Sequence, residues 1–462
     1  MFRRIKHVHF VGAGGIGMCG LAELLRDQGY RVSGSDLRAG ATVERLRSLG
    51  IEVAIGHEAS NVGSVDVVVY SSAVRPTNPE LLAAEERHIP VIPRAEMLAE
   101  VMRLKDGIAV AGSHGKTTTT SFIAHTLFSA GLDPTAVIGG RVLGAGGAPS
   151  GARLGEGDLL VAEADESDGS FLRLAPVVAV VTNIDPEHLD HYGSYEALKD
   201  AFVTFANCIP FWGCSVICLD QSGVQSIIPL LTRRYVTYGF ASQADLVASD
   251  VETLPEGVRF RMRKRGALVG TVNLRLSGRH NVLNALATVA VAQELDVPFD
   301  AIAEALASFV GIERRFELKG EIAGVRVIDD YAHHPTEIIA TLASARETHS
   351  GRIVAAFQPH RYTRTRDVWE EFIPAFNDAD IVILSEVYAA GEEKIPGVEA
   401  APLVDAIRAH GHRDARFVAD IDGVLDALAG EAQPGDLVLT LGAGSIATLG
   451  ARLIERLQET RG

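Results

Sequence analysis

Residues 107–122 read GIAVAGSHGKTTTTSF, and this stretch decides how the chain folds. The apolar run 108–111 predicts a buried strand, and a segment that can form a helix begins at Lys116. The glycines between them allow backbone N–H groups to turn inward, toward an anion at the helix N-terminus. Lys116 can reach the outer phosphates of a nucleotide, and the Thr117 hydroxyl can bind Mg²⁺. The stretch therefore predicts a phosphate loop, two residues shorter than the usual Walker pattern, in an enzyme that uses ATP. A glycine turn beside a solvated lysine is the alternative.

The composition is that of an ordinary globular protein. Hydrophobic residues make up 47% of the 462 residues and charged residues 22%, and a chain of this length is expected to form about three domains. The net charge of -16 argues against electrostatic binding of nucleic acid or of an anionic membrane. The four cysteines show no paired CxxC spacing, which predicts reduced thiols and a cytoplasmic location. No apolar run reaches the roughly 18 residues that a membrane helix needs.

The first strand and helix of the chain enclose a second glycine-rich turn. Residues 8–11 predict a strand, residues 12–17 read GAGGIG, and Asp36 follows a second strand about twenty positions further on. This GxGxxG arrangement suits the pyrophosphate of a dinucleotide or of a nucleotide-sugar, or glycines that serve only helix–sheet packing. A further strand at 65–70 ends in a segment where open α/β sheets bind ligands. Its candidate phosphate contacts are Ser71, Ser72 and Arg75.

An acidic segment and a histidine follow the next two predicted strands. Strand 158–162 runs into residues 163–168, EADESD, whose four carboxylates repel one another unless cations or hydrogen bonds offset them. Beside a phosphate loop, a carboxylate at the end of a strand can hold Mg²⁺, although a solvated acidic loop would look similar. His188 follows strand 177–181 in a loop flanked by carboxylates, which favours a role as ligand or as acid and base.

Two patterns mark the second half of the middle region. Residues 258–263 read VRFRMR, and their strict alternation predicts a strand with a solvated arginine face. His280 and Asn281 open a predicted helix. An asparagine can bridge the N6 and N7 edge of adenine and an imidazole can stack on its face, but a polar helix start would look similar.

The last third of the chain alternates predicted strands and helices. Strands are expected at 325–328, 353–357, 381–384 and 437–441. Residues 329–335, DDYAHHP, follow the first of these strands, and residues 358–366, QPHRYTRTR, follow the second. Both segments should therefore lie at one edge of a parallel sheet. A basic and aromatic loop there suits a carboxylate or a phosphate, either of which arginine can bind in bidentate fashion.

Taken together, these separate motifs resemble the Mur ligases of bacterial peptidoglycan synthesis, in order and spacing across nearly the whole chain. The motifs are GSHGKTTT at 112–119, EADES at 163–167, NIDPEH at 183–188, HN at 280–281, RRFE at 314–317 and DYAH at 330–333. Within the family, the GAGGIG turn with Ser35 and Asp36, and FQPHRYTRT at 357–365, point to the member that joins L-alanine to UDP-N-acetylmuramate.

The resemblance implies an α/β protein of three domains. A Rossmann-like domain at 1–105 would bind the UDP-sugar, a central phosphate-loop α/β domain at 106–311 would bind ATP, and a Rossmann-like α/β domain at 312–462 would bind the amino acid. ATP would phosphorylate the lactyl carboxylate of UDP-N-acetylmuramate, because a carboxylate alone is a poor acyl donor. The amine of L-alanine would then attack the acyl phosphate and give UDP-N-acetylmuramoyl-L-alanine, ADP and phosphate. These small molecules are the expected partners, with neither nucleic acid nor membrane among them.

The resemblance also implies a role for individual residues. The catalytic residues would be Lys116, Glu163, His188, Arg315 and His333. ATP would contact Gly112, Ser113, His114, Gly115, Lys116, Thr117, Thr118, His280, Asn281, Asn284, Arg315 and Asp330. Two Mg²⁺ ions would be held by Thr117, Glu163 and His188. The UDP-sugar would contact Gly12, Gly14, Gly15, Ile16, Gly17, Ser35, Asp36, His57, Ser71, Ser72 and Arg75. L-alanine or the reacting carboxylate would be enclosed by Tyr331, His333, Arg361 and Arg364.

The sequence departs from the family at two positions. Later-acting members carry a modified lysine that supports the second metal, but the aligned position here is Phe202 and the nearby Lys199 is out of register, so no modified lysine is expected. Ser445 stands where relatives are expected to carry an acidic or amide residue. One alternative function is a ligase that attaches a whole tripeptide to the same sugar nucleotide. Another is a nicotinamide-dependent oxidoreductase, which would rest on GxGxxG alone and leave Lys116 and Glu163 without a role.

Overall fold

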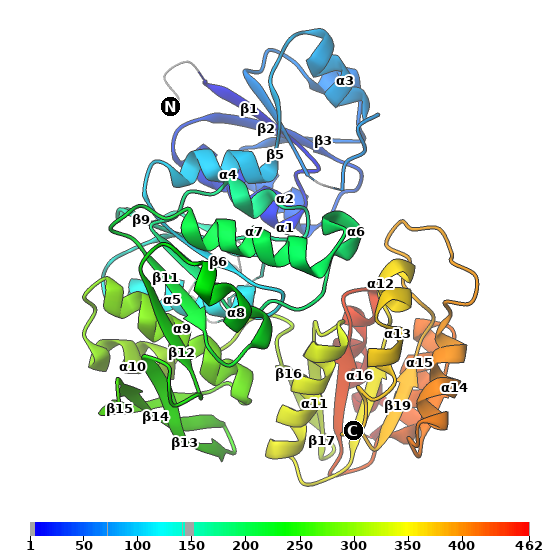
Figure 1. Ribbon diagram of the computed structural model, residues 1–462. Helices are drawn as coiled ribbons and strands as arrows, with labels where there is room; N and C mark the ends of the chain where they lie inside the picture. Colours follow the sequence, from blue (N-terminus) through cyan, green and yellow to red (C-terminus); the bar gives the residue numbers. More distant parts are fainter. Residues whose placement is uncertain (1–4, 72, 141, 144–151, 462) are drawn as a thin grey trace. The chain divides into compact units, whose positions relative to one another are not determined.

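The computed structural model describes residues 5–71, 73–140, 142–143 and 152–461, without the side chains of Ile16 and Arg461. The described chain divides into two compact units, both of α/β architecture as predicted (Figure 1). Unit 1 contains the described residues up to Val251 together with Phe260–Leu274 and Val282–Phe309. Unit 2 contains Glu252–Arg259, Arg275–Asn281 and the chain from Val310 onward.

The first sheet of unit 1 has five parallel strands in the order β3-β2-β1-β4-β5. The strands are β1 (His7–Val11), β2 (Arg31–Asp36), β3 (Glu52–Ile55), β4 (Val67–Tyr70) and β5 (Val91–Pro93). The helices are α1 (Ile16–Asp27), α2 (Ala41–Ser48), α3 (Pro79–Glu86) and α4 (Arg94–Met102), with a short 3₁₀ turn, η1 (Ala59–Asn61). The strand order reverses between β1 and β4, and doubly wound sheets bind ligands beyond the carboxyl ends of the strands at such a point.

The second sheet has ten strands in the order β15-β14-β13-β12-β11-β10-β6-β9-β7-β8. Its strands are β6 (Asp106–Ala111), β7 (Thr135–Val137), β8 (Ala152–Arg153), β9 (Leu159–Glu163), β10 (Val178–Val181), β11 (Cys214–Cys218), β12 (Tyr235–Gly239), β13 (Leu246–Leu254), β14 (Gly257–Lys264) and β15 (Ala267–Leu274). Its helices are α5 (Lys116–Ser129), α6 (Leu189–Tyr192), α7 (Tyr195–Asn207), α8 (Ser222–Ile227), α9 (Arg279–Glu294) and α10 (Phe299–Ser308), with 3₁₀ turns η2 (Ser170–Arg173) and η3 (Ile228–Leu230). The predicted arginine face of β14 is exposed, and Arg259 and Arg261 form ion pairs with acidic side chains.

The register of β6 against its two neighbours sets the position of the phosphate loop. Val110 pairs with Glu163 at the end of β9, and Ala111 pairs with Val181 at the end of β10. Because all three strands are parallel, the segments that follow them leave the sheet at the same edge. The glycine loop after β6, the acidic segment after β9 and the His188 loop after β10 are therefore neighbours.

Phe202, which stands where later-acting family members carry a modified lysine, is a buried residue of helix α7. The helix begins at the N-cap Ser194, whose hydroxyl accepts a hydrogen bond from the backbone N of Ala197 (3.2 Å). Its buried residues recur at helical spacing, and Phe202 is fully buried with its ring centroid 5.2 Å from that of Phe171. Lys199 lies over the ring of Tyr195 and pairs with Glu196. Position 202 is thus part of the hydrophobic core.

The sheet of unit 2 has six strands in the order β16-β17-β21-β18-β19-β20, and only the β16–β17 pair is antiparallel. The strands are β16 (Glu317–Ile322), β17 (Val325–Asp330), β18 (Ile353–Phe357), β19 (Ile381–Leu384), β20 (Ala415–Phe417) and β21 (Leu437–Leu441). The helices are α11 (Pro335–Thr348), α12 (Tyr362–Asp367), α13 (Trp369–Phe372), α14 (Ala400–Ala409), α15 (Ile421–Glu431) and α16 (Leu449–Arg461), with the 3₁₀ turn η4 (Ser445–Thr448). Helices cover both faces of the sheet, each over its own hydrophobic core. β17 and β18 both pair with β21, so the two predicted functional loops do leave the same edge.

The four cysteines are free thiols, in agreement with the sequence analysis. Cys19, Cys214 and Cys218 are buried, whereas Cys208 is exposed. Burial raises the pKa of Cys214 and of Cys218 to about 12. These two thiols are therefore protonated at neutral pH.

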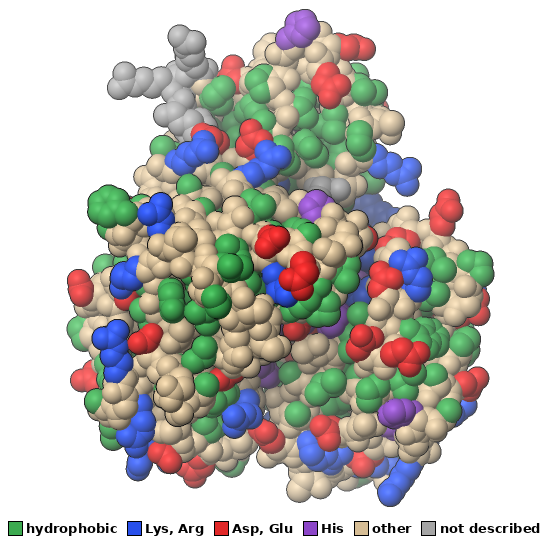
Figure 2. Space-filling model, in the orientation of Figure 1, with side chains coloured by type: hydrophobic (Ala, Val, Ile, Leu, Met, Phe, Trp, Pro, Cys, Tyr) green, Lys and Arg blue, Asp and Glu red, His purple; other side chains and the backbone are tan. Residues whose placement is uncertain are grey.

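The surface carries charges of both signs. On the face drawn in Figure 2, acidic and basic side chains are interspersed, and the chain as a whole has a net charge of -16. Among the described helices, none is both long and apolar enough to cross a membrane.

Replacement of Phe202 tests the packing of α7. We expect Phe202→Ala to lower the free energy of unfolding of unit 1 by about 3–5 kcal/mol, because it leaves a cavity in a closed core. Phe211→Ala is the matched control: this ring is 84% exposed, and its removal should change stability by less than about 0.5 kcal/mol. Urea denaturation of both variants measures the difference. Equal losses of stability would show that the ring of Phe202 is not a core contact.

Candidate active site

The loop between β6 and α5 has the backbone geometry of a phosphate loop. Gly112 and Gly115 have φ angles of 140° and 80°, in the left-handed region that favours glycine. A Cβ atom on Gly112 would lie 2.0 Å from Thr182 Oγ1, and one on Gly115 would lie 2.8 Å from Asn284 Oδ1. Both positions therefore require glycine for two reasons, the φ angle and the close approach of a neighbour.

Side chains from the end of β10 hold this loop in place. The backbone N of His114 donates to Asn183 Oδ1 (2.7 Å), and its carbonyl accepts from Asn183 Nδ2 (2.9 Å) and from Thr182 Oγ1 (2.6 Å). Ser113 Oγ accepts a hydrogen bond from the backbone N of Asp185 (2.9 Å). The predicted ATP contacts Ser113 and His114 are thus fixed before any ligand binds.

Lys116 is held by a carboxylate that the sequence analysis did not select. Its Nζ donates to the carbonyl of Gly112 (2.6 Å) and to Glu166 Oε1 (2.9 Å). Burial alone would lower the pKa of Lys116, but Glu166 and Asp165 raise it above its usual value. Burial raises the pKa of Glu166 to about 7, although Lys116 opposes this shift. The ammonium group of Lys116 therefore lies beside the glycine loop, bound to Glu166. An anionic ligand would compete with Glu166 for this ammonium group.

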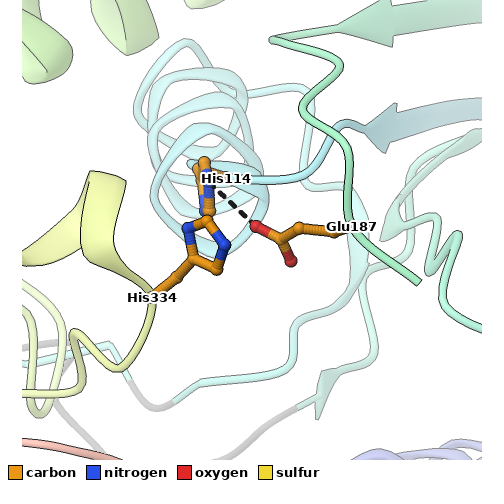
Figure 3. A group of neighbouring side chains, drawn as sticks. All are labelled: His114, Glu187 and His334. Carbon is orange, nitrogen blue, oxygen red and sulfur yellow. Dashed lines mark ion pairs between the residues drawn. The ribbon is translucent and has the colours of Figure 1, made fainter. Parts of the chain in front are cut away.

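Two imidazoles belong to this cluster, His114 from the glycine loop and His188 from the loop after β10. His114 Nε2 lies 3.0 Å from Glu187 Oε1 (Figure 3). The same atom lies 3.1 Å from Asp185 Oδ2. His188 Nε2 lies 3.8 Å from Glu166 Oε1 and 3.7 Å from Glu187 Oε2. The backbone of His188 has a φ of 55°, which is unfavourable for a residue with a side chain and is often found at functional sites. His188 therefore lies near two carboxylates, and its role as a ligand or as acid and base stays a prediction.

Glu163 and Thr117 lie at the two sides of the same loop. Glu163 ends β9, and its Oε1 accepts a hydrogen bond from the backbone N of Gly139 (2.9 Å). Thr117 is in the first turn of α5, one residue after Lys116, and Thr118 beside it is buried. Carboxylate and hydroxyl oxygens are ligand types that Mg²⁺ prefers, so Glu163 and Thr117 carry suitable donor atoms.

The three residues predicted to contact adenine lie in the first two turns of α9. His280 is exposed, as a ring that stacks on a base must be. Asn281 donates from Nδ2 to the carbonyl of Ser277 (2.7 Å), which is what a polar helix start would do. Asn284 is buried, and its Oδ1 accepts a hydrogen bond from Thr119 Oγ1 (3.1 Å). Asn284 therefore connects α9 to α5 and contacts the phosphate loop.

The amino-terminal glycine turn opens on a cavity of about 590 Å³ in unit 1. Among the predicted UDP-sugar contacts, the residues that line it are Gly12, Gly15, Asp36, His57, Ser71 and Arg75; Leu37, Ala73, Val74, Thr77, Asn78 and Pro79 were not predicted. Gly14 donates from its backbone N to Asp36 Oδ2 (2.8 Å), and Gly17 faces Arg94. Ser72 and the side chain of Ile16 lie outside the described residues. The cavity lies at the ends of β1 and β4, as the strand order requires.

Ser35 forms hydrogen bonds beside the cavity of unit 1. It is fully buried and is not among the described residues that line the cavity. Its hydroxyl donates to Glu80 Oε2 (2.6 Å) and lies 3.0 Å from His57 Nδ1. Ser35 is therefore placed to support His57, which lines the cavity.

In unit 2, the predicted amino-acid contacts gather at the ends of β17 and β18. The rings of Tyr331 and His333 meet edge to face, with centroids 5.1 Å apart, and His333 Nδ1 donates to the carbonyl of Tyr331 (3.0 Å). Arg364 Nη1 lies 3.4 Å from His360 Nδ1, and the ring of His360 stacks on that of Tyr388 at 5.5 Å. His360 and Tyr388 belong to this cluster although they were not selected as site residues.

Three further predicted residues of unit 2 are held by specific partners. Asp330 is buried and accepts hydrogen bonds from the backbone N of Phe316 and of Ala332, both at 2.7 Å. Burial raises its pKa to about 6, although Arg315 opposes this shift. The guanidinium of Arg315 lies over the ring of Tyr331 (5.1 Å). Arg361 has a φ of 70° and its Nε lies 3.3 Å from Glu392 Oε1.

Ser445 forms hydrogen bonds with the side chain of Gln358. Its hydroxyl exchanges hydrogen bonds with the side-chain amide of Gln358 at 3.1 and 3.2 Å. Gln358 Oε1 also accepts from the backbone N of Ile446 (3.1 Å). Ser445 therefore supports the start of the basic loop after β18.

Gly112 allows a direct test of the phosphate loop. We expect Gly112→Ala to weaken ATP binding by at least about tenfold, because the added methyl group forces the loop away from Thr182. Gly131→Ala is the matched control: Gly131 also has a positive φ (80°), but no atom of the described residues lies within 4 Å of its Cβ position. Titration with a fluorescent ATP analogue compares the two. Equal affinities in both variants would contradict the loop geometry.

Acid titration tests whether the buried carboxyl group of Glu80 is ionised in the folded protein. Burial would raise the pKa of Glu80, but hydrogen bonds from His9, Ser35 and Asn61 lower it from 4.5 to about 2. Ionised Glu80 therefore stabilises the folded state above about pH 4.5, and this contribution is lost as the pH falls toward 2. We expect the difference in Tm between the wild type and Glu80→Gln to shrink as the pH is lowered from 7 to about 3. A constant difference would show that this carboxyl is not ionised in the fold.

Three family models match the chain in consecutive order. They are described as Mur ligase family, catalytic domain (residues 7–106), Mur ligase middle domain (110–292) and Mur ligase, glutamate ligase domain (314–444). A curated relative named UDP-N-acetylmuramate--L-alanine ligase, from Sorangium cellulosum, is 57% identical and covers 96% of this chain and 95% of its own.

Solved structures give the same result. The UDP-N-acetylmuramate-alanine ligase of Thermotoga maritima matches with a TM-score of 0.84 and 30% identity, over 99% of this chain and all of that one (100%). A murein peptide ligase of Psychrobacter arcticus shares the fold at a TM-score of 0.73 and 24% identity, over 98% of each chain. The chain belongs to the Mur ligase family.

Proposed function

We propose that this protein joins L-alanine to the lactyl carboxylate of UDP-N-acetylmuramate at the expense of ATP, in peptidoglycan synthesis. The observation that carries the proposal is the close kinship, over nearly the full length, with a relative of that name. Two features of the site support it. A glycine loop beside a lysine suits a nucleotide phosphate, and a separate cavity with a GxGxxG turn suits a second nucleotide. An oxidoreductase would not need the cluster around Lys116.

Each of the three sheets would bind a different substrate. The sheet at 1–105 would bind the sugar nucleotide, the sheet at 106–311 would bind ATP and the sheet at 312–462 would bind the amino acid. The family models change at similar places along the chain. The free thiols of the chain support a cytoplasmic location. The use of ATP in the reaction supports the same location.

The residues of unit 1 would activate the carboxylate. Lys116 would exchange Glu166 for the outer phosphates of ATP, and the backbone N–H groups of the glycine loop would add hydrogen bonds. Thr117, Glu163 and His188 would hold two Mg²⁺ ions, which supply positive charge to the phosphoryl group in transfer. The product of this step is an acyl phosphate, in which phosphate has become a leaving group.

The residues of unit 2 would prepare the nucleophile. The ammonium of L-alanine must lose a proton before it attacks. Because His333 donates from Nδ1 to the carbonyl of Tyr331, its Nε2 carries the lone pair of the neutral ring and is the atom that would accept this proton. Arg361 and Arg364 would bind a carboxylate, and Arg315 would approach the phosphoryl group. Asp330 would contact the nucleotide.

Phosphate release tests the proposal directly. We expect release from ATP only when Mg²⁺, UDP-N-acetylmuramate and L-alanine are all present, and we expect Lys116→Ala to reduce the rate by at least about a hundredfold. Lys394→Ala is the matched control, because Lys394 is an exposed lysine paired with Glu399. Chelation of Mg²⁺ should stop the reaction in the wild type.

Other outcomes would redirect the assignment. Release with the tripeptide but without L-alanine would identify the tripeptide-attaching ligase instead. A Lys116→Ala variant as active as Lys394→Ala would show that the glycine loop does not bind the reacting phosphates.

A further inference from the structure

The carboxylate of Glu80 lies at the centre of a buried polar cluster beside the cavity of unit 1. Its side chain is fully buried, and it accepts hydrogen bonds from Ser35 Oγ and from Asn61 Nδ2, both at 2.6 Å. Two imidazoles face it: His57 Nδ1 is 3.5 Å from Oε1, and His9 Nε2 is 3.4 Å from Oε2. A buried carboxylate is costly unless such partners satisfy it, so the whole cluster depends on Glu80.

The proton positions around Ser35 follow from this arrangement. An ionised carboxylate only accepts hydrogen bonds, so the Ser35 hydroxyl donates its single proton to Glu80. Ser35 Oγ is also 3.0 Å from His57 Nδ1. With its own proton already used, it accepts a hydrogen bond from Nδ1. Glu80 thereby fixes the orientation of the His57 ring through Ser35.

The other nitrogen of this ring is left for a ligand. His57 lines the cavity of about 590 Å³, and its side chain is 12% exposed. With Nδ1 bound to Ser35, Nε2 is the polar atom of His57 that can meet a bound molecule. A protonated ring would donate from Nε2 to an anion, with its positive charge balanced by Glu80. Arg75 lines the same cavity and supplies a second cation.

We propose that Glu80 is a positioning residue for the sugar-nucleotide substrate, which holds His57 so that Nε2 meets the diphosphate. The inference rests on the proposed function, which supplies the ligand. It assigns to α3, which is far in sequence from the GAGGIG turn at 12–17, a part in substrate binding. Glu80 itself touches no ligand, and its effect passes through Ser35 and His57.

His9 provides a control within the same cluster. It faces the same carboxylate and is equally buried, and its Nδ1 lies 2.9 Å from Ser33 Oγ. It lines a separate cavity of about 610 Å³ and is not among the described residues of the first cavity. Loss of His9 therefore perturbs the cluster without removing the connection between Glu80 and His57.

The test is calorimetric titration of the full-length protein with UDP-N-acetylmuramate, without ATP. We expect Glu80→Gln and His57→Gln each to raise the Kd by about tenfold or more, and the double variant to bind no more weakly than His57→Gln alone. His9→Gln should stay within about twofold of the wild type, and the Kd for ATP should not change in any variant. In turnover, the KM for the sugar nucleotide should rise while kcat stays near that of the wild type.

Several results would overturn the inference. One is an unchanged Kd for UDP-N-acetylmuramate in Glu80→Gln. Another is a double variant whose fold-increase in Kd equals the product of the two single fold-increases. The third is a His9→Gln variant that binds the sugar nucleotide as weakly as Glu80→Gln does. If Glu80→Gln does not fold, Ser35→Ala carries the same expectation, because it removes the connecting hydroxyl and keeps the carboxylate. Failure of the wild type to bind UDP-N-acetylmuramate would be distinguishable, because it would refute the proposed function itself.

Discussion

The parallel register of β6 with β9 and β10 is the constraint on which the nucleotide site depends. Strands that run in the same direction end at the same edge, so three segments separated by many residues along the chain become neighbours without any direct sequence signal between them. Val110 opposite Glu163, and Ala111 opposite Val181, bring the glycine loop beside the acidic and histidine loops. A shift of one residue in this pairing would turn the side chains at the strand ends to the opposite face.

Charges inside the fold are arranged in partnered sets. Lys116 pairs with Glu166 beside the glycine loop, and Glu80 is surrounded by hydroxyl, amide and imidazole groups beside the first cavity. Each set satisfies a buried carboxylate that would otherwise destabilise the fold. In each set one member also faces a ligand site, which means that the structure and the binding chemistry share the same residues. Loss of such a residue affects stability and binding together.

Much of this arrangement could be predicted from the sequence. The strand–loop–helix around Lys116 has a strong local pattern, and so do the strands that precede His188, Tyr331 and Arg361. Fold and nucleotide loops therefore follow from short segments, because turn chemistry and hydrophobic periodicity are local properties. One hydrophobic core of unit 1 runs through both of its sheets, and the expected division at residue 105 stays a prediction.

The residues that sequence analysis missed have long-range partners. Glu166 was one of four neighbouring acids, and only its proximity to Lys116 distinguishes it. Glu80 had no motif, and its contacts come from β1, β2 and η1. The contact of Asn284 with adenine stays a prediction, and its hydrogen bond with Thr119, which no local pattern shows, joins residues 165 positions apart. The hydrogen bonds of Ser35 with Glu80 and with His57 also join residues far apart in the sequence. Such assignments depend on tertiary contacts, which no local pattern contains.

The distribution of thiols makes the molecule convenient for spectroscopy. Cys19, Cys214 and Cys218 are buried, and the last two are protonated at neutral pH, whereas alkylating dyes react with thiolates. Replacement of Cys208 alone would leave a background that maleimide reagents barely modify. A pair of new cysteines, one in each unit, could then carry donor and acceptor fluorophores and report the distance between the units while substrates bind.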